Sequence, residues 1–137
     1  DHYRVVSLIP VPLTRRYKPG KGVYPFERTV SGKEWRWLDR HAELELSSAP
    51  GSSAAMSFYL PPDAPEESTT VMVTAGASKA QVTVRRGVAS SLRLPIPDAR
   101  SVTIHFDTAT GYVPASVLGN RDPRLLAVQL LAVERRP

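Results

Sequence analysis

Six side chains near the two ends of the chain are the candidates for chemistry. They comprise two indoles, two guanidinium groups and two carboxylates, which suit stacking on sugar rings and hydrogen bonding to hydroxyl groups. They are Glu27, Trp35, Arg36, Trp37, Asp122 and Arg124. We expect any specific function to concentrate where the two end segments meet.

The two tryptophans set up a choice between a binding platform and a core. Trp35 and Trp37 lie two residues apart, so on a strand both indoles face the same side, while Arg36 faces the other. On a solvent face the indoles form an apolar platform for the C–H faces of sugar rings. In a core they are its largest side chains, since each buries well over ~150 Å². The sequence favours the core for at least one of them.

The charged candidates allow three interpretations. Glu27, Arg36, Asp122 and Arg124 stand among apolar neighbours, where partly buried ion pairs arise. The favoured interpretation is a pair of arginine–carboxylate clamps that tie the ends of the domain together. The other is a polar cluster that hydrogen-bonds sugar hydroxyls. A third possibility, catalysis by Glu27 and Asp122 as paired carboxylates, requires the two groups to lie roughly 5–9 Å apart across a cleft.

Metal and cofactor signals are weak. His105 and Asp107 share one face of a strand, but two ligands are too few for a metal site. The acidic loop with Asp63, Glu66 and Glu67 could hold Ca²⁺, although it lacks the regular Asp/Asn spacing of calcium loops. The chain has no cysteine, phosphate loop or nucleophile elbow. We therefore expect no cofactor, with Ca²⁺ as the one alternative.

The elements that must position these residues are β-strands. Apolar and polar residues alternate with a period of two, and turn signals recur every 10–12 residues, so an antiparallel sandwich of the jelly-roll type with about nine strands is predicted. The predicted strands cover residues 3–9, 42–46, 56–60, 71–75, 82–84, 92–96, 102–106 and 125–133. The segment 92–96 contains a proline and is followed by another, so it should be short or at an edge. The segment 125–133 is apolar on both faces apart from Gln129, so it should lie in the middle of the sandwich or be covered on both sides. Residues 34–43 and 114–118 could each form a short helical turn.

Composition sets broader limits. The 137 residues suit one domain, and residues 10–22 are expected to be an exposed basic loop rich in proline and glycine. The net charge of +5 is spread over small scattered groups, which argues against nucleic acid and leaves anionic glycans or lipid headgroups open. The excess of arginine over lysine, together with abundant alanine and valine, suggests a GC-rich bacterial genome. Because the chain opens at Asp1 without an initiator Met, we expect a processed product or an excised domain.

The motifs in order resemble a known family. Tyr-Pro-x-Glu ending at Glu27, Trp-Arg-Trp at residues 35–37, alternating strands, Tyr-Val-Pro at 112–114 and Asp-x-Arg-x-Leu-Ala-Val at 122–128 look like an extracytoplasmic jelly-roll domain. Such domains are galactose-binding-like or carbohydrate-binding-module-like. They occur on bacterial membrane glycosyltransferases and cell-envelope polysaccharide assembly proteins. The resemblance covers residues 23–133. The residues that match its recurring positions are Glu27, Trp35, Trp37, Asp122 and Arg124.

The resemblance implies a non-catalytic accessory domain that binds carbohydrate in bacterial cell-envelope glycan synthesis. The alternative is a structural interaction module that docks onto a membrane glycosyltransferase or partner subunit without binding sugar. The expected partners are therefore a glycan or the membrane portion of such a protein, with no nucleic acid. The resemblance also implies a domain excised from a larger membrane-associated protein. The expected location is extracytoplasmic, either in the periplasm or at the cell surface, with a tether to the membrane through that larger protein. Solvent-facing indoles would favour sugar binding, and buried indoles the structural role.

Overall fold

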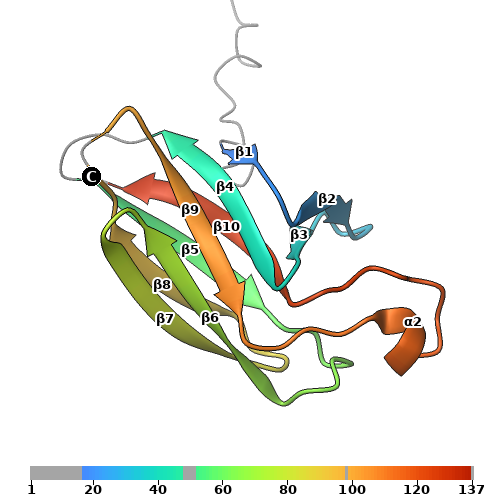
Figure 1. The fold of residues 1–137 in the computed structure, drawn as a ribbon. Coiled ribbons are helices and arrows are strands. Elements are labelled where there is room, and N and C mark those ends of the chain that lie inside the picture. Colours follow the sequence, from blue (N-terminus) through green and yellow to red (C-terminus); the bar gives the residue numbers. More distant parts are fainter. Residues whose placement is uncertain (1–16, 48–51, 98, 137) are drawn as a thin grey trace, which may run out of the picture.

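The protein is a sandwich of two five-stranded antiparallel sheets (Figure 1). The computed structural model describes residues 17–47, 52–97 and 99–136. The first sheet has the order β1-β4-β9-β6-β7 and the second has the order β2-β3-β10-β5-β8. The elements are β1 (Lys18–Pro19), β2 (Val23–Arg28), β3 (Glu34–Leu38), β4 (His41–Ser47), β5 (Ser53–Tyr59), β6 (Ser68–Ala75), β7 (Ser78–Arg85), β8 (Ser90–Pro95), β9 (Ser101–Thr108), α2 (Pro114–Val117) and β10 (Val128–Arg136).

Eight of the strands are paired as a nested hairpin. β6 pairs with β7, β5 with β8, β4 with β9 and β3 with β10, always antiparallel. Two further pairings, β5 with β10 and β6 with β9, join these four ladders into two sheets. A nested series of antiparallel pairs that is wound into two packed sheets in this way is the jelly-roll topology. β1 and β2 each add an edge strand beside β4 and β3. The predicted fold class is confirmed, with ten strands in the described ranges where about nine were predicted.

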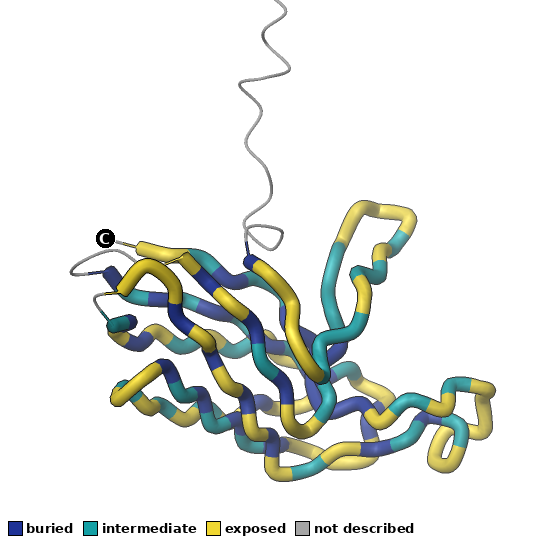
Figure 2. The backbone as a smooth tube through the Cα atoms, turned by 45° about the horizontal axis from the view of Figure 1, so that its top comes forward, coloured by how far each residue is buried: buried dark blue, intermediate teal, exposed yellow. Residues whose placement is uncertain are grey.

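The core follows from the alternation of the sequence. Along β9 every second residue is buried, and the inward side chains include Ile104 and Phe106. β5 repeats the pattern with Met56 and Phe58. The Phe58 and Phe106 rings meet edge to face, with centroids 5.8 Å apart and planes at 74°. Figure 2 shows the same alternation of buried and exposed positions along the strands. The two sheets are therefore held together by interdigitated apolar side chains.

Three finer predictions are also confirmed. β10 occupies the centre of its sheet, as its two apolar faces indicated. β8, which ends at Pro95, is an edge strand. The short helix α2 begins at Pro114, where the missing backbone donor of proline costs nothing.

One prediction is wrong, and two others concern residues that lie wholly or partly outside the described ranges. Residues 34–43 form no helical turn, because Glu34–Leu38 forms strand β3 and His41–Ser47 forms strand β4. The connection between them passes from one sheet to the other, and its corner is held by a hydrogen bond from Asp39 N to Gly22 O of 2.8 Å. The predicted strand 3–9 and residues 10–16 of the basic loop lie outside the described residues. In the rest of that loop Tyr17 is buried, while Lys18–Pro19 forms β1.

No helix within the described ranges is both long and apolar enough to cross a membrane.

Candidate functional site

The second sheet turns both tryptophans to its outer face. Arg36 pairs with Leu130, and Leu130 with Phe58, whose side chain is fully buried between the sheets. Residues on either side of Arg36 must therefore face outward, because side chains alternate along a strand. The prediction that Trp35 and Trp37 share one side is consistent with this register.

The two indoles nevertheless have different surroundings. Trp37 is only 6% exposed, because the chain between β9 and β10 covers it. Tyr112 from that covering segment meets the indole edge to face, with ring centroids 6.2 Å apart and planes at 85°. Burial raises the pKa of Tyr112 to about 12. Trp37 therefore belongs to the core, as predicted for at least one tryptophan. Trp35 is only partly buried and packs against the core.

Trp35 lines a cavity of about 440 Å³ on this outer face. The walls come from the turn between β2 and β3, from β3, β10 and the end of β5, and from the segment before β8. The lining residues are Thr29, Lys33, Glu34, Trp35, Tyr59, Ala89, Gln129 and Leu131. An indole, a phenol and a leucine thus supply apolar wall, and an amide, a hydroxyl and an ammonium group supply polar contacts. We call this the Trp35 cavity.

The turn beside the Trp35 cavity is held by local hydrogen bonds. Thr29 N donates to Lys33 O at 2.9 Å, and Lys33 N donates to the Thr29 hydroxyl at 3.1 Å. Glu34 is paired with Arg28, whose Nε donates to the Glu34 carboxylate at 3.1 Å. The negative charge of Glu34 is therefore compensated by Arg28, and the turn is held by its own hydrogen bonds.

The two end segments do meet, and Arg124 joins them. Its guanidinium binds the Glu27 carboxylate at 3.0 Å and the Asp122 carboxylate at 2.7 Å. It also lies over the Tyr24 ring, 5.2 Å from the centroid, while the Tyr24 hydroxyl donates to Leu125 O at 3.2 Å. The predicted clamp is confirmed for Arg124. Because one arginine engages both carboxylates and neither lines the Trp35 cavity, their arrangement argues against a catalytic pair.

Arg36 has a different environment. Its guanidinium stacks on the Phe26 ring at 3.9 Å from the centroid and lies 5.7 Å from that of Tyr17. One nitrogen donates to Tyr24 O at 3.1 Å. Arg36 therefore faces the inner side and joins β2 to β3 through aromatic rings in place of the expected carboxylate.

The clamp predicts a pH dependence. Hydrogen bonding from Arg124 holds the pKa of Asp122 below its ordinary 3.8. A carboxyl group with a depressed folded-state pKa contributes stability above its unfolded pKa, and this contribution is lost as pH falls through the folded pKa. We expect the difference in unfolding free energy between the wild type and Asp122→Asn to be constant near neutrality and to shrink below about pH 3.8. Urea denaturation at a series of pH values measures it, and a pH-independent difference would contradict the ion pair.

The ligand-binding roles predicted for the six candidates stay predictions, but the geometry separates them. Of the six, the structure gives Trp35 alone a place in the cavity wall. Apart from Trp35, the wall residues, which include Tyr59 and Leu131, were not predicted from the sequence. Tyr59 had a detectable signal, because it alternates with the inward Phe58 and Leu60 and so had to face outward. Gln129 had one too, as the polar exception in an apolar segment.

The described ranges contain no group of three or more potential metal ligands among His, Cys, Asp and Glu. The Asp107 carboxylate lies 2.7 Å from His41 Nδ1, so it has a partner within the protein. The expectation of no cofactor, with Ca²⁺ at Asp63, Glu66 and Glu67 as the alternative, stays a prediction.

Comparison with known proteins shows the fold. No protein-family description matches the chain, and no curated protein matches it. Among solved structures, it is similar to the CBM22-1 xylan-binding domain from Paenibacillus barcinonensis Xyn10C, with 12% sequence identity and a TM-score of 0.51 over 92% of this chain and 88% of that one. It is also similar to TmCBM61 in complex with β-1,4-galactotriose, with 11% identity and a TM-score of 0.42 over 91% and 90% of the two chains.

The similarity to the xylan-binding domain supports the class of architecture. At such low identity it shows the jelly-roll sandwich alone, which the strand pairing shows independently. Both of these structural neighbours are carbohydrate-binding modules. No family match supports an association with glycosyltransferases.

Proposed function

We propose that this domain is a non-catalytic carbohydrate-binding module and that the Trp35 cavity is its binding site. The observation that carries the proposal is the placement of Trp35 and Tyr59 in the wall of one cavity on the outer face of a sheet. A pyranose has an apolar C–H face and a rim of hydroxyl groups. Aromatic rings suit the C–H face, and the Gln129 amide and the Lys33 ammonium group suit the hydroxyl groups.

The construction of the cavity supports this assignment. Trp35, Gln129 and Tyr59 come from three neighbouring strands, and the ladder pairs Gln129 directly with Tyr59. Sites built on strands lose little conformational entropy when a ligand binds. The volume of about 440 Å³ falls within the usual range for small-molecule sites. A glycan ligand agrees with the similarity of the fold to a xylan-binding domain.

The proposal extends to a cellular setting: an extracytoplasmic accessory domain in bacterial cell-envelope glycan synthesis, associated with a membrane glycosyltransferase. The support for this setting is the order of motifs over residues 23–133. The Arg124 clamp and the buried Trp37 favour a structural role for most of those motif residues. A docking module that binds no sugar is therefore the second candidate.

The test is a glycan-array screen of the chain followed by calorimetric titration of the best ligand. Trp35→Ala should weaken binding by about 2 kcal/mol, the loss typical of an aromatic hot spot, which corresponds to roughly thirtyfold in Kd. Tyr59→Ala should weaken binding in the same direction. Val30→Ala is the matched control, because Val30 is a fully exposed apolar residue of the adjoining turn that does not line the cavity.

Circular dichroism must show that each variant remains folded. Failure of the folded wild type to bind any glycan would favour the docking module. Binding that Trp35→Ala and Tyr59→Ala leave unchanged would place the sugar elsewhere on the domain.

A further inference from the structure

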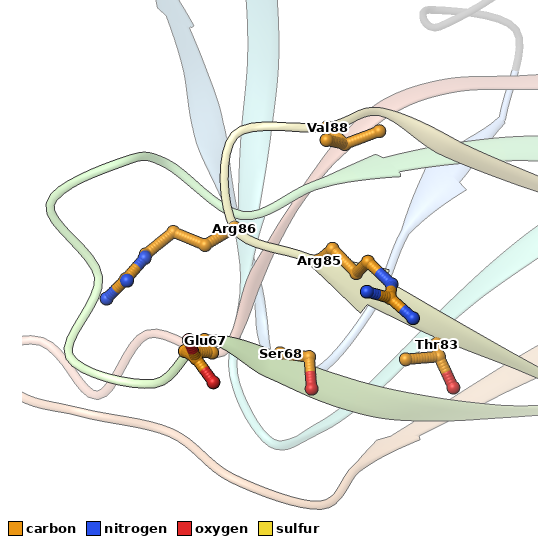
Figure 3. Close-up of a pocket in the computed structure, with 6 residues that line it drawn as sticks. All are labelled: Glu67, Ser68, Thr83, Arg85, Arg86 and Val88. Atoms are coloured by element: carbon orange, nitrogen blue, oxygen red, sulfur yellow. The ribbon is translucent and has the colours of Figure 1, made fainter.

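A second cavity, of about 380 Å³, lies where β6 begins and β7 ends. Its lining is mostly polar and shares no residue with the Trp35 cavity (Figure 3). The lining residues are Glu67, Ser68, Thr83, Arg85, Arg86 and Val88. We call it the Arg85 cavity.

The strand pattern determines which side chains face this cavity. Val84 is fully buried, so Thr83 and Arg85 on either side of it must point to solvent. Ser68 stands directly opposite Arg85 in the β6–β7 ladder. Figure 3 shows the Arg85 guanidinium extending over Thr83, with the Ser68 and Thr83 hydroxyl groups directed to the same side. One guanidinium and two hydroxyl groups are thus gathered on a rigid two-stranded surface.

Arg86 has a different task. Its guanidinium turns away from Arg85 (Figure 3) and donates to Ala64 O at 3.1 Å. Its backbone N–H donates to Glu67 O at 2.8 Å, and Gly87 N donates to Leu60 O at 2.7 Å. These bonds hold the wall of the cavity in place and do not involve the Arg85 side chain.

Neither Arg85 nor Glu67 has a hydrogen bond or ion pair through its side chain within the part of the chain that the structure describes. An arginine in this position presents a planar set of donors that matches an oxyanion. Serine and threonine hydroxyls can complete the shell of donors. Glu67 opposes a negative ligand, so it should weaken binding and confine the ligand to the Arg85 side.

We propose that the Arg85 cavity binds an oxyanion group, a carboxylate, phosphate or sulfate, through Arg85 with help from Ser68 and Thr83. The proposal is independent of sugar binding at Trp35, because the two cavities have no residue in common.

The test is an NMR titration of backbone amides in the full chain with three probes: sodium sulfate, sodium phosphate and sodium glucuronate, at constant ionic strength. We expect saturable shifts at Ser68, Thr83 and Arg85 with at least one probe. Arg85→Gln should weaken binding by at least about tenfold, since a hydrogen bond to a charged group contributes roughly 1.5–3 kcal/mol. Glu67→Gln should tighten binding, because it removes the repulsion. All of these side chains are exposed, so the substitutions leave the core untouched.

Lys79→Gln provides the matched control. Lys79 is exposed on the same solvent face of β7 as Arg85 but does not line the cavity. The Lys79→Gln substitution therefore removes one positive charge without altering the site. Its effect should stay within about twofold, because surface charges beyond a Debye length are screened. Preference for glucuronate would indicate an acidic glycan, and preference for sulfate or phosphate would indicate an inorganic or esterified anion. Shifts that do not saturate, or an equal loss with Lys79→Gln and Arg85→Gln, would mean an adventitious ion only and would overturn the proposal.

Discussion

Trp37→Ala is expected to lower the free energy of unfolding by about 3–5 kcal/mol, the range found when a buried large aromatic side chain is removed. The indole is 6% exposed and makes an edge-to-face contact with Tyr112. Its loss would leave a void under the segment that closes the outer face near β3. Guanidinium denaturation followed by far-ultraviolet circular dichroism measures the change without relying on tryptophan fluorescence.

Trp35→Ala is the informative partner of this variant. It removes the same side chain from the same face of the same strand, but from the wall of an open cavity. We expect a clearly smaller loss of stability and a large loss of glycan affinity. Equal losses of stability for the two variants would contradict the division between a core indole and a site indole.

Phe58→Ala should cost a similar 3–5 kcal/mol, for a different reason. Phe58 and Phe106 are both fully buried, and they come from different sheets. Their edge-to-face contact at 5.8 Å lies across the middle of the sandwich. Truncating one ring therefore removes apolar contacts from both layers at once. The same denaturation experiment measures the loss.

Phe58→Leu keeps a larger apolar side chain than alanine at this position and should cost clearly less than Phe58→Ala, because the cavity left behind is smaller. A double-mutant cycle with Phe106→Leu isolates the contact between the rings. Its coupling energy should be about 0.5–1.5 kcal/mol, the usual value for an aromatic pair. A coupling energy of zero would show that the two rings stabilise the sheets independently.

The strands could be predicted from the sequence because burial on one face imposes a period of two. The segment with Ile104 and Phe106 is an example: each inward residue alternates with a polar one, and the structure buries just those positions. Pro95 likewise predicted the edge position of β8, because proline has no backbone N–H to donate to a neighbouring strand. The pairing of β3 with β10 was beyond such reasoning, because nothing in either strand alone identifies a partner far away in the chain.

The helical turn predicted at residues 34–43 shows how local patterns fail. This stretch mixes aromatic, charged and apolar residues without a clear period, because β3 and β4 use their two faces differently. Trp37 faces outward yet is covered by a loop, so both faces of β3 carry buried residues. A corner between the sheets then interrupts the pattern. The covering segment is a tertiary effect that periodicity cannot show.

The candidate site was predicted in part. Trp35 lies in a cavity wall, as its alternative interpretation required. Asp122 and Arg124 stood out because charged residues among apolar neighbours are unusual, and the structure explains them by the clamp. Tyr59 and Gln129 were missed, because they reach the cavity from strands that are adjacent in space and distant in sequence.

The central position of β10 has a consequence for how the domain is made. β10 is the last of the described strands, and it lies between the β2–β3 hairpin and the β5–β8 pair. While a ribosome is still making the chain, those two pairs have no strand to join them, and Gln129 is missing from the cavity wall. Pairing of strands so distant in the chain is slow, on the order of milliseconds to seconds in small β-proteins. The Trp35 cavity therefore comes into existence only after synthesis has passed β10, as one of the last features of this sandwich to form.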